Sequence, residues 1–166
     1  MLDIIRNSDG SVTIREVNVS RETLADFMEK YDGTTEYNGI VADCQKWFYG
    51  SLVKAAWCST FLCYAMNQLG ILKKNLSDKH ENVFYLYTDL KKHCKEVTAK
   101  EAKRGDIVVL NFSPPFAWNS NKHVTVLASP IDGSGLASCI GGNQSDRICT
   151  KLYSVGDIVG IFRPNA

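Results

Sequence analysis

Cys58, at the start of the segment CSTFLCYAMNQLGI, is the residue of this sequence best placed to act as a nucleophile. A cysteine attacks as its thiolate, and the free N–H groups and dipole of a helix N-terminus stabilise that anion. Cys58 stands where the helical spacing of apolar residues begins, whereas Cys63 lies inside the same run. The plainer interpretation is a small buried core residue. The third interpretation is that Cys58 forms half of a disulfide or of a metal-binding pair.

A cysteine nucleophile needs a base, and the chain contains three histidines. His80 lies in the polar segment SDKHEN and is expected to be a solvated loop residue. His93 lies in the lysine-rich segment LKKHCKE and is expected on an exposed helix face. His123 opens the β-rich run HVTVLAS, directly after a loop with an aromatic character suited to a cleft wall. A histidine at a strand start is more often structural, but among the three His123 is the predicted base.

Asn143 is the predicted third member of a Cys-His-Asn arrangement, in which a polar side chain holds the imidazole in the useful tautomer. The two runs on either side of PIDGSG form a predicted hairpin. If its turn is centred on Gly133, Leu127 faces Cys139 and His123 faces Asn143. Directly opposed side chains of an antiparallel pair lie on one face, within about 5.5 Å at Cβ. A register shift of one residue would leave Asn143 as a strand terminator only.

The elements that must position these residues follow one another in a simple order. Helical spacing marks residues 20–31, 58–69 and 83–94, with Ser20 as the predicted N-cap of the first and Gly70 as the stop of the second. The second half contains the β-rich runs GDIVVLNF, HVTVLAS, LASCIGG and DIVGIFR, separated by turn-forming residues. This order predicts an α+β fold, with N-terminal helices packed on a C-terminal antiparallel β-sheet.

The composition is that of an ordinary globular protein, with 166 residues, 45% hydrophobic residues and a net charge of +1. It predicts a single domain over 1–166, with a hairpin over 1–19, and gives no reason to expect nucleic acid or a membrane span. The first residues lack the basic and apolar stretches of a signal peptide, so synthesis in the cytoplasm is expected. Six cysteines without a C-x-x-C pair predict reduced thiols and no structural zinc.

Four segments, WCSTFLCYAMNQLGI, RGDIVVL, KHVTVLAS and IGGNQSD…VGIFRP, together resemble the CHAP-like amidases and peptidases of the papain-like NlpC/P60 superfamily, in particular a phage and prophage subgroup. The resemblance covers residues 34–164. It implies a papain-like fold and cleavage of an amide bond in bacterial peptidoglycan. It also implies that Cys58 is the nucleophile, His123 the base and Asn143 the orienting residue, with an acyl-enzyme as the intermediate.

Two positions depart from the pattern of that family. Gly141 stands where some relatives carry an acidic residue, and Lys122 replaces the usual small residue before the histidine. The Asp-rich calcium loop of certain phage lysins has no match, so neither a metal nor another cofactor is expected. Trp57, Trp118 and Phe116 are expected to line the cleft, although an aromatic residue before a core helix is more often packing.

The expected partner is bacterial peptidoglycan, and a monomer is expected. One setting is a phage or prophage lysin released through another protein's membrane lesion; the other is a delivered effector with an immunity protein. In both, the protein acts at the cell wall, in the periplasm or outside the cell. A non-catalytic virion-structural or wall-binding module on the same fold is the rival, and the intact set of Cys58, His123 and Asn143 argues against it. A disulfide-stabilised secreted domain is a third reading.

Overall fold

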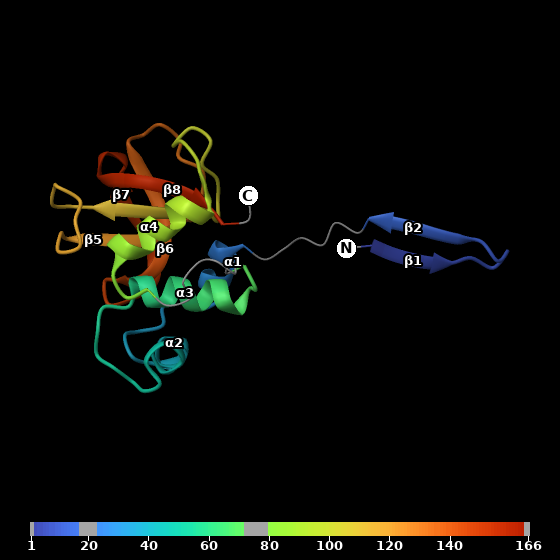
Figure 1. Cartoon of the computed structure of the whole chain (residues 1–166), viewed down its shortest axis with the longest axis horizontal. Helices are drawn as coiled ribbons and strands as arrows, with labels where there is room; N and C mark the ends of the chain where they lie inside the picture. The colour runs from blue at the N-terminus through green and yellow to red at the C-terminus, as the bar shows by residue number, and fades with distance from the viewer. Residues whose placement is uncertain (1, 17–22, 72–79, 165–166) are drawn as a thin grey trace.

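The computed structural model describes residues 2–16, 23–71 and 80–164. These residues form four α-helices, a two-stranded hairpin and a six-stranded antiparallel sheet (Figure 1). The helices are α1 (Leu24–Glu29), α2 (Gly39–Tyr49), α3 (Cys58–Gln68) and α4 (Val83–His93). The strands are β1 (Leu2–Arg6), β2 (Val12–Glu16), β3 (Lys95–Glu96), β4 (Ile107–Asn111), β5 (Lys122–Leu127), β6 (Leu136–Gln144), β7 (Arg147–Ser154) and β8 (Ile158–Arg163). The α+β prediction is confirmed.

The large sheet has the strand order β3-β8-β4-β5-β6-β7, and every neighbouring pair is antiparallel. The four predicted β-rich runs are β4, β5, β6 and β8. The sequence reading missed β7 and the two-residue β3. Strand β7 lies at the edge of the sheet and most of its residues are at least partly exposed, so its sequence carries no sustained apolar run. Its backbone pairing with β6 defines it instead.

Apolar residues cover both faces of the sheet, which is why β4 is buried along its whole length. Alternate residues of a strand point to opposite faces. One face packs against α1, α3 and α4. The other carries a smaller cluster closed by the segment after β3. The first face contributes Ile107, Val109, Val124, Val126, Ile140 and Phe162, and the second Val108, Leu110, Leu127, Ala137, Cys139 and Ile161.

Local hydrogen bonds set where the helices begin and end. Thr23 caps α1, because its Oγ1 accepts from the Asp26 N–H (3.1 Å) while Asp26 Oδ2 accepts from the Thr23 N–H (3.0 Å). This capping box places the cap at Thr23; the predicted cap, Ser20, lies outside the described residues. Helix α3 begins at Cys58 as predicted, and Gly70 follows it in the left-handed region with φ +66°.

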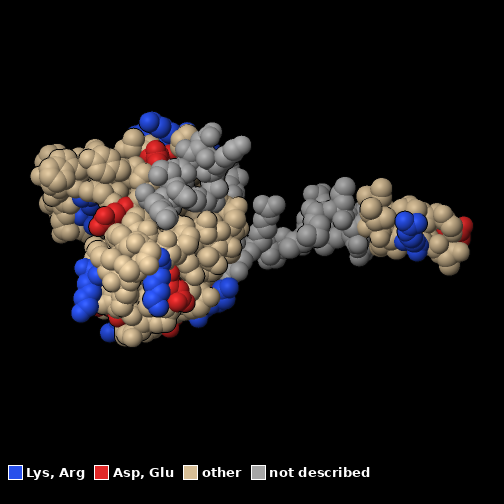
Figure 2. Space-filling view, turned by 60° about the horizontal axis from the view of Figure 1, so that its bottom comes forward, with Lys and Arg blue, Asp and Glu red and all other residues tan. Residues whose placement is uncertain are grey.

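Charged side chains are interspersed on the face shown in Figure 2 rather than gathered by sign. Ion pairs join distant segments. Arg104, just before β4, contacts Asp26 (2.7 Å) and Glu29 (2.8 Å) of α1, and Arg163 contacts Asp106 (2.9 Å). These pairs fix α1 and the end of β8 against the start of β4. Among the described residues, none of the helices has the length and apolar character needed to cross a bilayer.

The predicted N-terminal hairpin is confirmed, and it lies apart from the helices and the large sheet (Figure 1). Ile4 pairs with Ile14, and the two side chains are 63% and 62% exposed. A two-stranded hairpin is marginally stable in water by itself. The hairpin makes no part of the candidate site described next.

Candidate active site

Cys58 lies where strands β5 and β6 separate. The two strands pair only at Val126–Ile140 and Leu127–Cys139, so the first half of β5 has no partner on that side. Helix α3 contacts both strands, and its first residue enters this opening. The backbone N–H of Val124 donates to the Cys58 sulfur, as does that of Ser59. The gap in the sheet therefore supplies a hydrogen-bond donor that regular pairing with β6 would otherwise have used.

The Cys58 thiol and the His123 imidazole hydrogen-bond each other. Both side chains are buried, 9% and 8% exposed. Burial by itself raises the pKa of the thiol, but the hydrogen bond and charge of His123, with the two backbone donors, hold it below its ordinary value. Burial by itself lowers the pKa of the His123 imidazole. The hydrogen bond and the charge of the Cys58 sulfur together outweigh this effect, so the imidazole pKa is raised. These opposite shifts favour a thiolate–imidazolium pair.

The residue that holds the imidazole is Gln144, not the predicted Asn143. The pairing of Leu127 with Cys139 is as predicted, but β6 leaves regular pairing between Gly141 and Gln144, and Asn143 has φ +58°. This bulge shifts the side chains by one position. Gln144 Oε1 lies 3.0 Å from His123 Nε2, whereas Asn143 lines the groove beside the imidazole.

The orientation of the Gln144 amide also assigns the tautomer of His123. Gln144 Nε2 donates to the carbonyl oxygens of Cys139 (3.1 Å) and Cys149 (2.6 Å), which only an NH₂ group can do. Its Oε1 therefore faces His123 and also accepts from Thr125 Oγ1 at 2.7 Å. Because this oxygen can only accept, His123 Nε2 carries the hydrogen. The other ring nitrogen, Nδ1, is left for the thiol.

Gly141, beside the Thr125–Gln144 hydrogen bond, has no space for a side chain. A Cβ on Gly141 would lie 2.6 Å from Thr125 Oγ1 and 3.2 Å from Gln144 Oε1. The glycine therefore leaves room for the Thr125–Gln144 hydrogen bond. The dipeptide Asn143-Gln144 was visible in the sequence, but choosing its second member required knowledge of the bulge.

Trp57 is a core residue, which corrects its predicted place on the cleft wall. It is 0% exposed, packs edge-to-face on Phe61 at 6.1 Å between ring centroids, and donates its indole N–H to Glu36 (3.2 Å). A Cβ on Gly142 would lie 2.7 Å from the indole, so this glycine permits close packing of β6 on Trp57. The indole is thus part of the core packing directly before the start of α3.

The two other predicted cleft aromatics lie in one loop and differ in exposure. Trp118 is 61% exposed, and its backbone carbonyl accepts from Asn82 Nδ2 at 2.9 Å, which ties the loop to the start of α4. Phe116 is half-buried and packs against Phe84 and Tyr87 of α4, with ring centroids 5.2 and 5.0 Å away. Phe116 anchors the loop, and Trp118 remains available at its surface.

His80 and His93 are less exposed than predicted. His80 Nε2 lies 2.5 Å from Asp89 Oδ2 of α4, and its side chain is only 13% exposed. Its backbone carbonyl accepts from Ser59 Oγ at 2.6 Å, so the segment before α4 is tied to the first turn of α3. His93 is half-buried at the end of α4. His123 is the histidine that contacts Cys58.

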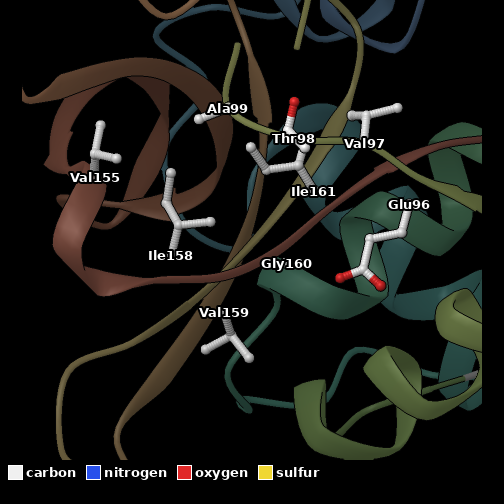
Figure 3. Close-up of a pocket in the computed structure, with 9 residues that line it drawn as sticks. All are labelled: Glu96, Val97, Thr98, Ala99, Val155, Ile158, Val159, Gly160 and Ile161. Carbon is white, nitrogen blue, oxygen red and sulfur yellow. The ribbon is translucent and has the colours of Figure 1, made fainter. Parts of the chain in front are cut away.

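Two grooves of about 540 Å³ each occur on the described surface. One lies beside His123 and is lined by Phe112, Asn121, Lys122, His123, Asn143, Lys151, Leu152, Tyr153, Ser154 and Asp157. The other follows β8 and the segment after β3. Figure 3 shows its mostly aliphatic lining, with Glu96 as the charged member. Only the first groove contacts a residue of the Cys58–His123–Gln144 line.

None of the six cysteines forms a disulfide. Within residues 2–16, 23–71 and 80–164, no group of three or more histidine, cysteine or acidic side chains could hold a metal ion. The candidate site brings together a thiol, an imidazole, a side-chain amide and backbone N–H donors. Those groups are the ones needed for nucleophilic acyl transfer.

Comparison with known proteins gives one informative similarity. No protein-family model matches the chain. No curated protein matches it either. The crystal structure of a wild-type endolysin, LysIME-EF1, is similar with a TM-score of 0.56 at 11% sequence identity, over 86% of this chain and 62% of that one. At this identity the similarity shows the fold alone, and this chain spans 62% of the length of the endolysin chain.

Proposed function

We propose that this protein hydrolyses an amide bond of bacterial peptidoglycan through Cys58. The observation that carries the proposal is the hydrogen-bonded line from Cys58 through His123 to Gln144. The fold shared with an endolysin supports the choice of the cell wall as substrate. The finer assignment to the CHAP-like amidases and peptidases of the NlpC/P60 superfamily is part of the same proposal, and rests on the sequence motifs.

In the proposed mechanism the Cys58 thiolate attacks the amide carbonyl carbon, and the carbonyl electrons move to oxygen. Backbone N–H groups in the first turn of α3 lie next to the reacting sulfur and are suited to stabilise this oxyanion. His123 gives its proton to the leaving nitrogen as the C–N bond breaks, which leaves a thioester on Cys58. His123 then takes a proton from water, whose oxygen attacks the thioester, and the acid product leaves.

Gln144 is the proposed positioning residue of this mechanism, in place of Asn143. Its amide is held by two strand carbonyls and cannot rotate without losing both hydrogen bonds. It keeps the hydrogen of His123 on Nε2, so that Nδ1 accepts the thiol proton. An imidazolium formed during the reaction is also stabilised by the amide oxygen at 3.0 Å.

The test is digestion of purified peptidoglycan, followed by measurement of new amino groups and mass spectrometry of the soluble fragments. We expect new amino groups without new reducing sugar ends, and fragment masses that identify the bond as sugar-to-peptide or within the peptide. Protein alkylated by iodoacetamide at neutral pH is the matched control and is expected to be inactive. A wild-type protein that binds the wall but releases no amino groups would be a non-catalytic wall-binding module, and the proposal would be wrong.

A further inference from the structure

The groove beside His123 is bounded by the imidazole and not by the nucleophile. His123 and Asn143 line it, together with residues of β7 and of the segment before β8, while Cys58 does not. In amide hydrolysis the protonated imidazole must reach the leaving nitrogen, whereas the acyl part stays on the sulfur. A substrate held at both groups therefore extends its leaving part from the imidazole. This places the groove where the leaving part would lie.

Tyr153, in the wall of this groove, contacts both the imidazole of His123 and the exposed ammonium group of Lys151. The Tyr153 ring lies 5.6 Å from the His123 ring and stacks on Phe112 at 6.1 Å with an interplanar angle of 28°. Lys151 Nζ lies 5.8 Å from the centroid of the same Tyr153 ring. Lys151 is exposed, and it forms no ion pair with any described residue. Because Lys151 lines the groove, its positive charge is available to a ligand bound there.

A second ammonium group, that of Lys122, also lines the groove. Lys122 Nζ donates to the backbone carbonyls of Trp118 (2.6 Å) and Ser120 (3.0 Å), which fix its position without cancelling its charge. The described lining has one carboxylate, that of Asp157, so the two lysines leave the groove with a positive balance. Neutral peptide or sugar groups would gain nothing from this balance, whereas a carboxylate would gain charge-assisted hydrogen bonds.

We propose that this groove binds the leaving part of the substrate through a carboxylate, with Lys151 as its charge partner and the Tyr153–Phe112 pair as its apolar wall. The inference rests on the proposed hydrolase function for the position of the leaving part. It adds that the preferred wall peptide carries a free carboxylate near the scissile amide and that its amidated form is disfavoured. Lys151 acts in binding and has no part in proton transfer.

The test compares untreated peptidoglycan with the same material after carbodiimide coupling to ammonia, which converts its carboxylates to neutral amides. Retention of the Cys58→Ala protein on the insoluble wall is measured over a range of wall concentrations. We expect Lys151→Gln in this background to weaken retention on the untreated wall about fivefold, and Lys151→Glu to weaken it further. On the amidated wall, retention should be weaker than on the untreated wall and independent of residue 151. Alkylated wild-type protein repeats the measurement without the Cys58 substitution.

Lys92→Gln is the matched control, because Lys92 is an exposed lysine of α4 that does not line the groove. Equal retention on the two walls, or equal losses for Lys92→Gln and Lys151→Gln, would overturn the groove assignment. Hydrolysis of untreated wall by proteins that retain Cys58 is measured in parallel. Retention that depends on Lys151 without any hydrolysis would reject the proposed function alone; hydrolysis with retention independent of Lys151 would reject the groove alone.

Discussion

Two buried thiols, one in the apolar core and one at the start of helix α3, have pKa values shifted in opposite directions. In the middle of the helix bundle, Cys44 and Cys63 are 0% exposed and belong to the apolar core. Burial raises the pKa of the Cys44 thiol to about 12. At the N-terminal end, Cys58 is only 9% exposed, yet the pKa of its thiol is lowered. Solvent exposure therefore does not separate the Cys58 thiol, whose pKa is lowered, from the Cys44 thiol, whose pKa is raised.

The difference lies in what each sulfur contacts. Cys58 meets an imidazole and two backbone N–H groups, because the separation of β5 from β6 exposes the N–H of Val124. In the core, dense apolar packing leaves desolvation as the largest influence on Cys44. A thiolate in a buried site requires hydrogen-bond donors and a nearby positive charge to offset the loss of water. The split in the sheet provides one donor, the N–H of Val124, and His123 provides the charge.

The largest expected effect is the loss of hydrolysis in Cys58→Ser. A serine hydroxyl is a far weaker nucleophile in a site shaped for a thiolate, so the rate should fall by at least about 10³-fold. Cys63→Ser is the matched thiol replacement inside the same helix and should keep the activity of its folded fraction. Rates of amino-group release from peptidoglycan measure both variants. Activity of Cys58→Ser near that of the wild type would contradict the assigned nucleophile.

His123→Ala should cost about 10²- to 10⁴-fold in rate and also change the titration of Cys58. Without the imidazole, burial remains the largest influence and moves the thiol pKa upward. The wild-type thiolate therefore persists below the ordinary thiol pKa and is lost only as the pH falls through the lowered value. In the variant, iodoacetamide should alkylate Cys58 only at higher pH.

His80→Ala is the control for the histidine substitution, because it removes a partly buried contact with Asp89 and leaves the Cys58–His123 pair intact. Stability should fall modestly, and the pH profile of Cys58 alkylation should not move. A shift of the profile as large as that in His123→Ala would show that the effect is structural and would weaken the assignment of the base.

Gln144→Ala should lower turnover by up to about 10²-fold, less than loss of the base, because the imidazole is misplaced but still present. The carbonyls of Cys139 and Cys149 lose their donor, so the free energy of unfolding should also fall by about 1–3 kcal/mol. Asn143→Ala is the matched neighbour and should change turnover less. Measuring kcat and the alkylation profile at equal folded fraction separates positioning from stability. A larger turnover loss in Asn143→Ala would restore Asn143 as the third member.

The smallest expected effect is that of Cys63→Ala. This substitution removes a small buried side chain from the apolar core and should lower the free energy of unfolding by about 1 kcal/mol. Turnover at a temperature well below the unfolding transition should match the wild type. Chemical denaturation measures the first quantity and amino-group release the second. A stable but inactive Cys63→Ala protein would contradict the contrast between Cys58, at the start of α3, and Cys63, in its middle.

Much of this site was predictable where its cause is local. The apolar spacing that starts at Cys58 predicted α3, and the β-rich run after His123 predicted β5. The turn signal at Gly133 predicted the register as far as the Leu127–Cys139 pair. These features depend on residues close together in the chain, whose propensities and spacing can be read directly.

The errors share a different cause. Trp57 was expected at a cleft, yet the missing side chain at Gly142, far along the chain, lets β6 pack on it. The sequence does not predict strand β7, because it is an edge strand that is defined by its pairing with β6 rather than by apolar residues. His80 contacts Asp89 rather than solvent, and the sequence does not give the position of the helix that carries Asp89. Each error concerns a contact between segments that only packing brings together.

The sequence by itself determined a cysteine at a helix start, a histidine at a strand start and an α+β order of elements, because backbone propensity and periodicity act over a few residues. Only the tertiary structure decided that Gln144, rather than Asn143, meets the imidazole. The glycines of β6 permit a bulge, but its place depends on Trp57 filling the space above Gly142 and on Thr125 occupying the space beside Gly141. Because side chains of a strand alternate, that displacement of one residue selects which amide contacts His123.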